Sequence, residues 1–384
     1  MKSPVSITAL ASISALGSTY EDIWSHYLNS IHFISEKKFT KFTALVAQLS
    51  EKDKSEINLL RNSDSKYKCL DDSVLYGVYV ARKAVANAKW TSSENVGVNM
   101  GSSRGATTLF EKYHKAFLNN DFAETLSSPT TTLGNISSWV AHDLQTQGPD
   151  ISHSITCSTG LHALLNGVVW LESGMADKFL IGASEAALTD FTIAQMQALK
   201  VYARQSQPYP CQALNLNKKQ NTMVVGEAAS AMCLERGYVK NALAQIEGVG
   251  YATEVLEHNV SISTNAECFQ KSMKMALGDV ALTEVDAIVM HAPGTIRGDL
   301  SEVNAIQEVF GGHKPLLTSN KWKLGHTFAS SGLMSVELAI MMLNKQEFIP
   351  VPYIEQENIQ KPLRKIIVNA VGFGGNAVSV LLTK

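Results

Sequence analysis

A cysteine at a predicted strand-to-helix turn is the residue of this chain best suited to nucleophilic chemistry. Small and β-branched residues lead into Cys157, a Ser-Thr-Gly turn follows, and an apolar run occupies 161–171. The apolar positions of that run go nearly all the way round a helix, so we expect a buried helix. Cys157 would then lie at a helix start, where unpaired N–H groups and the positive end of the helix dipole favour a thiolate with a pKa well below the usual value of about 8.5. The alternative is a cysteine that only fills the core.

Two histidines and a lysine stand after predicted strands in the second half of the chain. His291 follows the apolar stretch 287–290, and Lys321 and His326 follow the stretch 315–319. A neutral imidazole donates a hydrogen bond without carrying a permanent charge, which suits the stabilisation of an oxygen anion. A soft nucleophile with two such donors could hold an acyl group as a thioester and stabilise an enolate. Taken singly, each histidine could be structural and the lysine could be solvated.

The elements that must bring these residues together alternate between strands and helices. Such alternation is typical of mostly parallel sheets covered by helices. In these sheets reactive groups gather at the carboxyl ends of strands, where Cys157, His291, Lys321, His326 and Phe373 all fall. The same succession of elements occurs twice, which indicates a repeat of architecture. The corresponding stretches are 96–105 and 287–298, 151–160 and 315–325, and 179–185 and 367–375.

The composition excludes several classes of protein. The chain has 384 residues, 45% hydrophobic and 18% charged, with a net charge of −2, so no global field points to nucleic acid or to a membrane surface. Its five cysteines are scattered without metal-ligand spacing, so we expect no disulfide framework and no metal, and a reducing cytoplasm fits best. No stretch reaches the roughly 18 apolar residues of a membrane span. Serine and threonine interrupt the apolar opening, so we expect a first strand over 5–11 in place of a signal peptide.

Some local predictions are less well marked by pattern. The segment 37–70 is polar and shows no period, and we predict irregular structure there. Asp72 is expected to cap a long helix that runs through Trp90. The stretch 127–132 reads as a loop, and the strand over 365–371 is expected to end in a glycine-rich turn.

Four motifs of the chain resemble those of the elongating β-ketoacyl-acyl-carrier-protein synthases, members of the thiolase-like condensing enzymes with a Cys-His-His site. They are Thr-Cys-Ser-Thr-Gly at 156–160, His-Ala-Pro-Gly-Thr-Ile-Arg-Gly-Asp-Leu-Ser-Glu at 291–302, Ser-Asn-Lys-Trp-Lys-Leu-Gly-His at 319–326, and Gly-Phe-Gly-Gly at 372–375. They occur in the order and spacing of that family, and the resemblance covers essentially the whole chain. It implies duplicated α/β halves, over 1–240 and 241–384, layered α-β-α-β-α around five-stranded, mostly parallel sheets.

The resemblance also implies an activity and assigns roles to residues. The chain would carry an acyl group on Cys157 and condense it with a malonyl unit that loses CO₂, giving a 3-oxoacyl carrier protein. His291 and His326 would stabilise the enolate, and Lys321 would hold the charge balance around His326 and Cys157. The backbone N–H groups of Cys157 and Phe373 would form the oxyanion hole.

The remaining roles are supporting ones. Phe373 would gate access to the cysteine, and its flanking glycines Gly372, Gly374 and Gly375 would let the loop move. Glu302 would fix the histidine network from behind, or it and Asp299 could merely brace a helix. Thr295 keeps a hydroxyl position that the family uses toward the phosphopantetheine arm.

The resemblance implies partners as well. The acyl carrier protein supplies the phosphopantetheine arm, so no dissociable cofactor is expected. Because carriers are acidic, Lys66 and Lys68 are candidate contacts. A dimer is expected, either of two copies or with another ketosynthase-like subunit.

Departures from the family pattern keep an alternative open. Ala292 and Pro293 replace a Gly-Thr pair, which removes one hydroxyl near the pantetheine arm. This favours a specialised branch in fatty-acid or type II polyketide assembly, such as polyene or aryl-polyene pigments. It also keeps open a non-catalytic, chain-length-factor-like partner of a heterodimer, although such partners usually lose the cysteine. A thiolase is disfavoured, because thiolases use a second cysteine near the carboxyl end and no cysteine follows Cys268. An initiating synthase is disfavoured, because those enzymes use a His and an Asn where this chain has His326 in a Gly-His pair.

Overall fold

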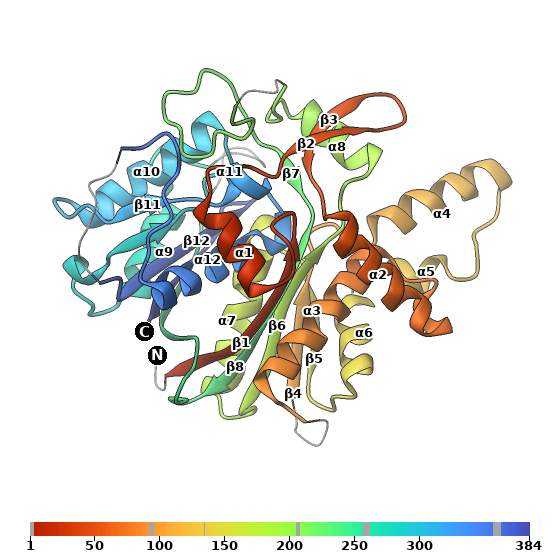
Figure 1. Ribbon diagram of the computed structural model, residues 1–384, viewed down its shortest axis with the longest axis horizontal. Helices are drawn as coiled ribbons and strands as arrows, with labels where there is room; N and C mark the ends of the chain where they lie inside the picture. Colours follow the sequence, from red (N-terminus) through yellow and green to blue (C-terminus); the bar gives the residue numbers. More distant parts are fainter. Residues whose placement is uncertain (1–3, 92–95, 134, 205–207, 256–261, 356–361) are drawn as a thin grey trace.

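The computed structural model describes residues 4–91, 96–133, 135–204, 208–255, 262–355 and 362–384. Strands and helices alternate along the chain (Figure 1). The elements up to residue 236 are β1 (Val5–Ser14), α1 (Tyr20–Leu28), β2 (Ser35–Lys38), β3 (Thr43–Ala47), α2 (Glu51–Ser63), η1 (Ser65–Tyr67), α3 (Asp72–Ala88), β4 (Val96–Gly101), α4 (Thr107–Asn120), α5 (Ser127–Thr131), α6 (Asn135–Leu144), β5 (Asp150–His153), η2 (Thr156–Ser158), α7 (Thr159–Glu172), β6 (Lys178–Glu185), α8 (Asp190–Ala198), β7 (Val225–Gly226) and β8 (Ala228–Arg236). The later elements are β9 (Ala244–Thr253), α9 (Glu267–Leu277), η3 (Leu282–Glu284), β10 (Ala287–Val289), α10 (Ile296–Phe310), β11 (Leu316–Thr318), α11 (Lys321–Leu324), η4 (Phe328–Ser330), α12 (Ser331–Lys345), β12 (Lys365–Gly372) and β13 (Asn376–Thr383).

The two halves build sheets of the same design. The first has the strand order β5-β4-β6-β8-β1 and the second β11-β10-β12-β13-β9, so each strand of one half has a counterpart in the other. In both, only the fourth strand, β8 or β13, runs against the other four, because its pairings on both sides are antiparallel. The predicted correspondence of stretches is confirmed, since β4, β5 and β6 match β10, β11 and β12.

A short joint makes the two sheets continuous. Val5–Ile7 of β1 pairs antiparallel with Ala244–Ile246 of β9, which links the five strands of each half into one sheet of ten. The sequence predicted separate five-stranded sheets and contained no signal for this pairing. The joint forms where the two halves meet, at the first strand of each.

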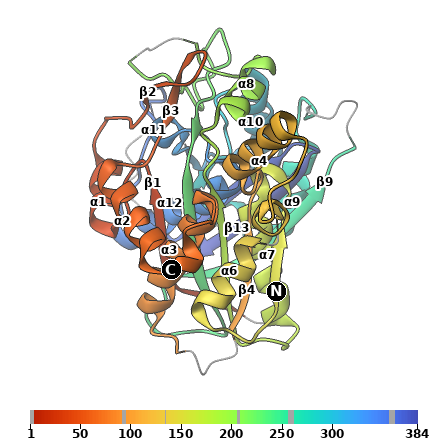
Figure 2. The same ribbon diagram turned by 90° about the vertical axis from the view of Figure 1, so that its right-hand side faces the viewer.

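Helices α7 and α12 form the middle layer of the molecule. Each packs on strands of both halves and on the other helix, whereas α3 and α6 cover the first sheet from outside and α9 and α10 lie on the outer side of the second (Figures 1 and 2). The described residues of α12 up to Leu343 are all buried, as expected for a helix that is apolar nearly all the way round. The predicted α-β-α-β-α layering is therefore confirmed.

Several local predictions were wrong. The segment 37–70 contains β3 and α2, and its strands join β7 in a small separate sheet. The prediction failed because α2 buries only Asp53, Ile57 and Leu60, which leaves almost no apolar period to detect. The stretch 127–132 contains the short helix α5, and the strand β13 after the glycine-rich turn was not predicted. Asp71, and not Asp72, caps α3, because its side chain accepts from the Ser73 N–H.

Candidate active site

The predicted elbow at Cys157 is present between β5 and α7. Thr156, the residue before the cysteine, has a φ of +46°, a backbone conformation that non-glycine residues rarely adopt. Two hydroxyls hold the turn: Ser103 Oγ and Thr159 Oγ1 each donate to the Thr156 carbonyl at 2.6 Å. Hydrogen bonds from the loop after β4 and from the first residue of α7 therefore stabilise the sharp bend directly before Cys157.

The end of β12 presses against this bend. A Cβ added at Gly372 would lie 2.0 Å from Thr156 Oγ1 and 2.6 Å from the Ile155 carbonyl oxygen, so only glycine permits the approach. Phe373 follows with 43% of its surface exposed. Gly374 and Gly375 continue the turn with φ of +96° and +68°, which a residue with a side chain would resist. The glycines of the motif thus place Phe373 beside the cysteine turn.

A buried carboxylate holds the loop of the first histidine. The backbone N–H groups of His291 and Ala292 donate to Glu302 Oε1 and Oε2 at 2.9 and 2.8 Å. Asn369 Nδ2 from β12 donates to the same carboxylate at 3.2 Å. Glu302 lies on α10, which starts with Thr295 as its cap, accepting from the Gly298 N–H at 3.1 Å. Glu302 therefore fixes the backbone at His291 and leaves the imidazole free to face elsewhere.

Asp299, one turn earlier on α10, ties a second loop to the same place. Its Oδ1 accepts from the Gly294 N–H at 3.0 Å, and its Oδ2 accepts from the Leu214 N–H at 2.8 Å and from Lys218 Nζ at 2.7 Å. Both members of the Lys218 ion pair are buried. Breaking such a pair on one side leaves an unpaired buried charge, so Asp299 is a structural anchor for the histidine loop.

The second histidine follows the short helix α11. The His326 N–H donates to the Val224 carbonyl at 2.7 Å, and its own carbonyl accepts from the Gly226 N–H at 3.0 Å. The rings of His291 and His326 meet edge to face, with centroids 5.2 Å apart and planes at 88°. Lys321, on α11, is buried, and its Nζ has no hydrogen-bond partner in the described part of the chain.

Cys157, His291 and His326 line one cavity of about 600 Å³. Most of its lining is apolar, and the polar groups that reach it come from different elements: Cys157 from the elbow, His291 and Thr295 from either end of the first histidine loop, and His326 from the loop after α11. The remaining lining residues include Met196, Val201, Asn221, Met223, Ile262, Pro293, Ile296, Arg297, Gly298, Phe328, Val371, Gly372 and Phe373. An apolar cavity with a few convergent polar groups is typical of a substrate site.

The other candidate residues do not line the cavity. Lys321, Glu302 and Asp299 lie buried behind it, and Gly374 and Gly375 lie beyond Phe373. Lys66 and Lys68 belong to the turn between α2 and α3, where Lys66 pairs with Asp64 at 3.6 Å. Within the described residues no group of three His, Cys, Asp or Glu side chains could hold a metal ion, and no helix is long and apolar enough to cross a membrane.

The expected low pKa of the cysteine was wrong. Burial, aided by the Glu185 carboxylate, raises the pKa of Cys157 from 9.0 to about 12, although Lys321 and Arg104 act in the opposite direction. Three pKa steps correspond to about 4 kcal/mol, whereas the start of a helix contributes at most about 2 kcal/mol to a favourably placed charge. Loss of water therefore outweighs the helix, and the Cys157 thiol is protonated.

Burial sets the charges of the other groups. It lowers the pKa of His326 to about 3 and that of His291 well below 6.5, with Lys321 adding to both effects. Both imidazoles are therefore neutral hydrogen-bond donors at physiological pH, as the sequence indicated. Burial also lowers the pKa of Lys321 to about 8, against the opposing pull of Glu302.

Three residues near the cysteine were not predicted. Glu185, at the end of β6, is fully buried and accepts from Ser102 Oγ at 2.9 Å and from the Ser103 and Arg104 N–H groups. The Arg104 guanidinium lies 5.8 Å from the Phe328 ring, which in turn lies 5.6 Å from the His326 ring. A strand ending in Gly-Ala-Ser-Glu was a usable signal for Glu185, but no pattern in the sequence marks Arg104 or Phe328.

Comparison with known proteins gives a consistent result. Residues 2–239 match the family described as beta-ketoacyl synthase, N-terminal domain, and residues 243–355 match its C-terminal domain. The 3-oxoacyl-[acyl-carrier-protein] synthase 1 of Buchnera aphidicola subsp. Baizongia pistaciae is 26% identical over 99% of this chain and 99% of its own. Two solved structures share the fold at low sequence identity. The ishigamide ketosynthase/chain length factor has a TM-score of 0.86 at 17% identity and full coverage of both chains. A type II PKS acyl-carrier protein in complex with its ketosynthase has a TM-score of 0.84 at 18% identity, covering 100% of this chain and 99% of that one.

Proposed function

The chain belongs to the beta-ketoacyl synthase family, and we propose that it is a 3-oxoacyl-acyl-carrier-protein synthase that joins two acyl units by decarboxylative Claisen condensation. One observation carries the proposal: Cys157 and two neutral imidazoles, His291 and His326, line the same apolar cavity. The name of the Buchnera relative describes the same activity.

The first half-reaction transfers an acyl group to Cys157. The sulfur attacks the thioester carbonyl of an acyl carrier, the carrier's C–S bond breaks, and the thiol proton passes to the departing carrier sulfur. Because one thiol replaces another, no net charge has to enter the dry cavity. The N–H groups of Cys157 and Phe373 would receive the transient oxyanion, since a helix start and a glycine-rich turn leave backbone donors free.

The second half-reaction forms the new carbon–carbon bond. A malonyl carrier loses CO₂, and the electron pair of the broken bond forms an enolate whose oxygen accepts hydrogen bonds from His291 and His326. The enolate carbon then attacks the Cys157 thioester, so that a C–C bond forms, the C–S bond breaks and the sulfur takes up one proton from solvent, the proton that the overall condensation consumes. Lys321, buried without a hydrogen-bond partner among the described residues, would oppose the negative charge that develops. No dissociable cofactor takes part.

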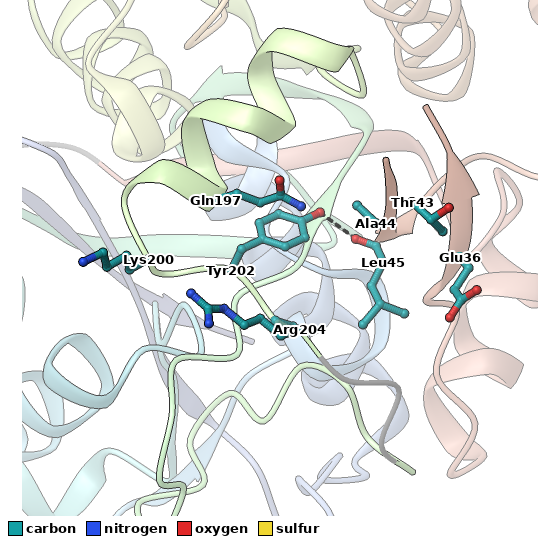
Figure 3. A pocket seen from close by; sticks show the side chains of 9 residues that line it. Glu36, Thr43, Ala44, Leu45, Gln197, Lys200, Tyr202 and Arg204 are labelled. Carbon is teal, nitrogen blue, oxygen red and sulfur yellow. Dashed lines mark hydrogen bonds between the residues drawn. The ribbon is translucent and has the colours of Figure 1, made fainter. Parts of the chain in front are cut away.

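The carrier would dock at the cavity mouth. Asn221 joins two cation-bearing segments there, because its Nδ2 donates to the Lys200 carbonyl at 3.0 Å and its Oδ1 accepts from the Ile296 N–H at 2.9 Å. Lys200 and Arg204 flank Tyr202 in the neighbouring cavity of about 500 Å³, and the Tyr202 hydroxyl donates to the Leu45 carbonyl at 2.5 Å (Figure 3). With exposed Arg297 on the cavity wall, these cations suit an acidic partner. Contacts of Lys66 and Lys68 with the carrier remain a prediction.

A dimer, the cytoplasmic location and the pathway are further parts of the proposal. Strand β5 is the outermost strand of its half of the sheet, and helix α4 exposes Phe110 and Phe117; an open sheet edge and exposed aromatic side chains each favour a surface that a partner subunit covers. All five cysteines are free, which suits a reducing compartment. We assign the reaction to fatty-acid or type II polyketide assembly; the narrower role in pigment formation and the choice between a homodimer and a heterodimer stay predictions.

The test is intact-protein mass measurement after incubation with acyl carrier protein. The wild-type chain is expected to gain the mass of the acyl group, and Cys157→Ala is expected to gain none. Cys69→Ala is the matched control, because Cys69 is exposed and does not line the cavity, and this variant should be acylated normally. If the wild-type chain never gains acyl mass, alone or with a partner subunit, the proposed activity is contradicted and the non-catalytic, chain-length-factor-like partner is favoured.

A further inference from the structure

A further carboxylate is buried in the middle layer, and it does not line the catalytic cavity. Glu337 lies on α12 with 1% of its surface exposed. Its Oε1 accepts from Ser12 Oγ of β1 at 2.7 Å, whereas Oε2 has no hydrogen-bond partner in the described part of the chain. A buried carboxylate that is satisfied on one oxygen only calls for a further donor.

This carboxylate reaches a cavity of about 420 Å³ that shares no lining residue with the catalytic one. The cavity lies among β1, the start of α1 and the end of α3, which are neighbours in both views of the fold (Figures 1 and 2). Leu10, Ile23 and Leu243 give it apolar walls. Its volume falls within the roughly 300–1,000 Å³ of small-molecule pockets.

The opposite end of this cavity is positive. Lys83 and Asn87 stand one turn apart on α3, and they are more exposed than Glu337, so they form the rim while Glu337 forms the floor. Lys83 Nζ donates to the Ser18 carbonyl at 3.2 Å and lies 4.4 Å from the Tyr79 ring, but no carboxylate in the described ranges pairs with it. Asn87 Nδ2 makes one long bond, 3.4 Å, to the Leu10 carbonyl. Both rim groups can therefore still bind an acceptor.

We propose that this cavity binds a small amino-acid-like zwitterion, with its ammonium group on Glu337 Oε2 and its carboxylate toward Lys83 and Asn87. Such a ligand would make a charge-assisted hydrogen bond at each end, and its methylene groups would contact the apolar walls between them. This order of groups matches the cavity, which has Glu337 at its floor and Lys83 and Asn87 at its rim. The proposal does not depend on the condensation activity. Its site adjoins α12, the helix that begins shortly after His326.

The charge state of Glu337 supports a pH-dependent affinity. Burial raises the pKa of Glu337 to about 7, with only Ser12 opposing. The other titratable groups that face it are Tyr20 and Tyr27 of α1, whose hydroxyls stay neutral because burial raises their pKa, and Lys83 at the rim. An ammonium ligand needs the ionised carboxylate, so binding should strengthen as the pH rises through 7.

The experiment is isothermal titration calorimetry of the full chain with glycine, β-alanine and 4-aminobutyrate, and with n-butylamine and butyrate as single-charge probes. We expect at least one zwitterion to bind about tenfold more tightly than either single-charge probe. Glu337→Gln and Lys83→Met should each weaken this binding by about tenfold or more, while the exposed Glu347→Gln should leave it unchanged. Lys83→Met keeps the test valid if the buried substitution alters the fold.

Two results would overturn the proposal. One is the absence of binding by all three zwitterions, which would mean that water alone satisfies Oε2. The other is binding that Glu337→Gln and Lys83→Met leave unchanged. Acylation of Cys157 measured in parallel separates this outcome from a failure of the proposed condensation activity.

Discussion

Replacing Gly372 by alanine tests the packing on which the cysteine elbow depends. The new methyl group would stand 2.0 Å from Thr156 Oγ1 and 2.6 Å from the Ile155 carbonyl oxygen, well short of the 3.4 Å at which ordinary contact begins. The threonine side chain could turn away, but the carbonyl belongs to the backbone and cannot. We therefore expect the end of β12 and the elbow to separate, with a loss of about 1–3 kcal/mol in the free energy of unfolding.

Two measurements check this expectation. Denaturant unfolding gives the free energy, and alkylation by iodoacetamide, followed at the Cys157 peptide by mass spectrometry, reports the position of the thiol. Gly312→Ala is the matched control, because an added methyl there meets no atom within 4 Å, and its effect should stay within about 0.5 kcal/mol. If Gly372→Ala were as stable as this control and its Cys157 reacted at the wild-type rate, the close approach of β12 to the elbow would be refuted.

Four further variants probe charge. Lys321→Met should slow alkylation of Cys157 at every pH up to about 8, the pKa to which burial lowers this lysine, because the variant lacks a cation that favours the thiolate. Equal alkylation rates in the variant and the wild type would show that Lys321 does not influence the charge state of the thiol. The raised pKa of Glu337 means that the folded state holds its proton more tightly, so this group's contribution to stability is complete below pH 4.5 and is lost as the pH rises to about 7. Glu337→Gln should therefore reduce the change in the free energy of unfolding between pH 4.5 and 7 by up to about 3 kcal/mol. A pH dependence equal to that of the wild type would contradict this prediction. Arg297→Glu should raise the KM for the acyl carrier and leave acyl transfer from a small thioester unchanged. The double variant Lys66→Glu, Lys68→Glu tests the other candidate contact by the same measurement. If only the double variant raises the KM, the carrier docks near η1.

The cysteine and the two histidines that line the cavity could be predicted because motif and topology agree. Cys157, His291 and His326 each follow a strand, and parallel strands bring their carboxyl ends to one edge. Their spacing along the chain was therefore enough to place them together. The same reasoning located Phe373, since a glycine on either side of it marks a turn.

What the sequence could not provide was burial. Lys321 and Lys323 look like solvated residues in a polar loop, yet both are buried because α11 lies beneath other segments of the chain. The cysteine's pKa was wrong for the same reason, since a local pattern shows the helix start but not the loss of water around the sulfur. Arg104 reaches Phe328 from a distant loop, and α2 buries only two apolar side chains, Ile57 and Leu60. Long-range packing decides all of these.

The junction of β1 with β9 constrains how the polypeptide is made. The first strand lies between β8 and β9, and a bond such as that from Ser6 Oγ to the Gly237 carbonyl spans 231 positions of sequence. On the ribosome, this strand must wait, unpaired, until most of the chain has emerged, and such distant pairings form slowly. Fragments that stop before residue 244 would expose two sheet edges at once, so chaperone assistance during synthesis and aggregation of truncated products are the expected biological consequences.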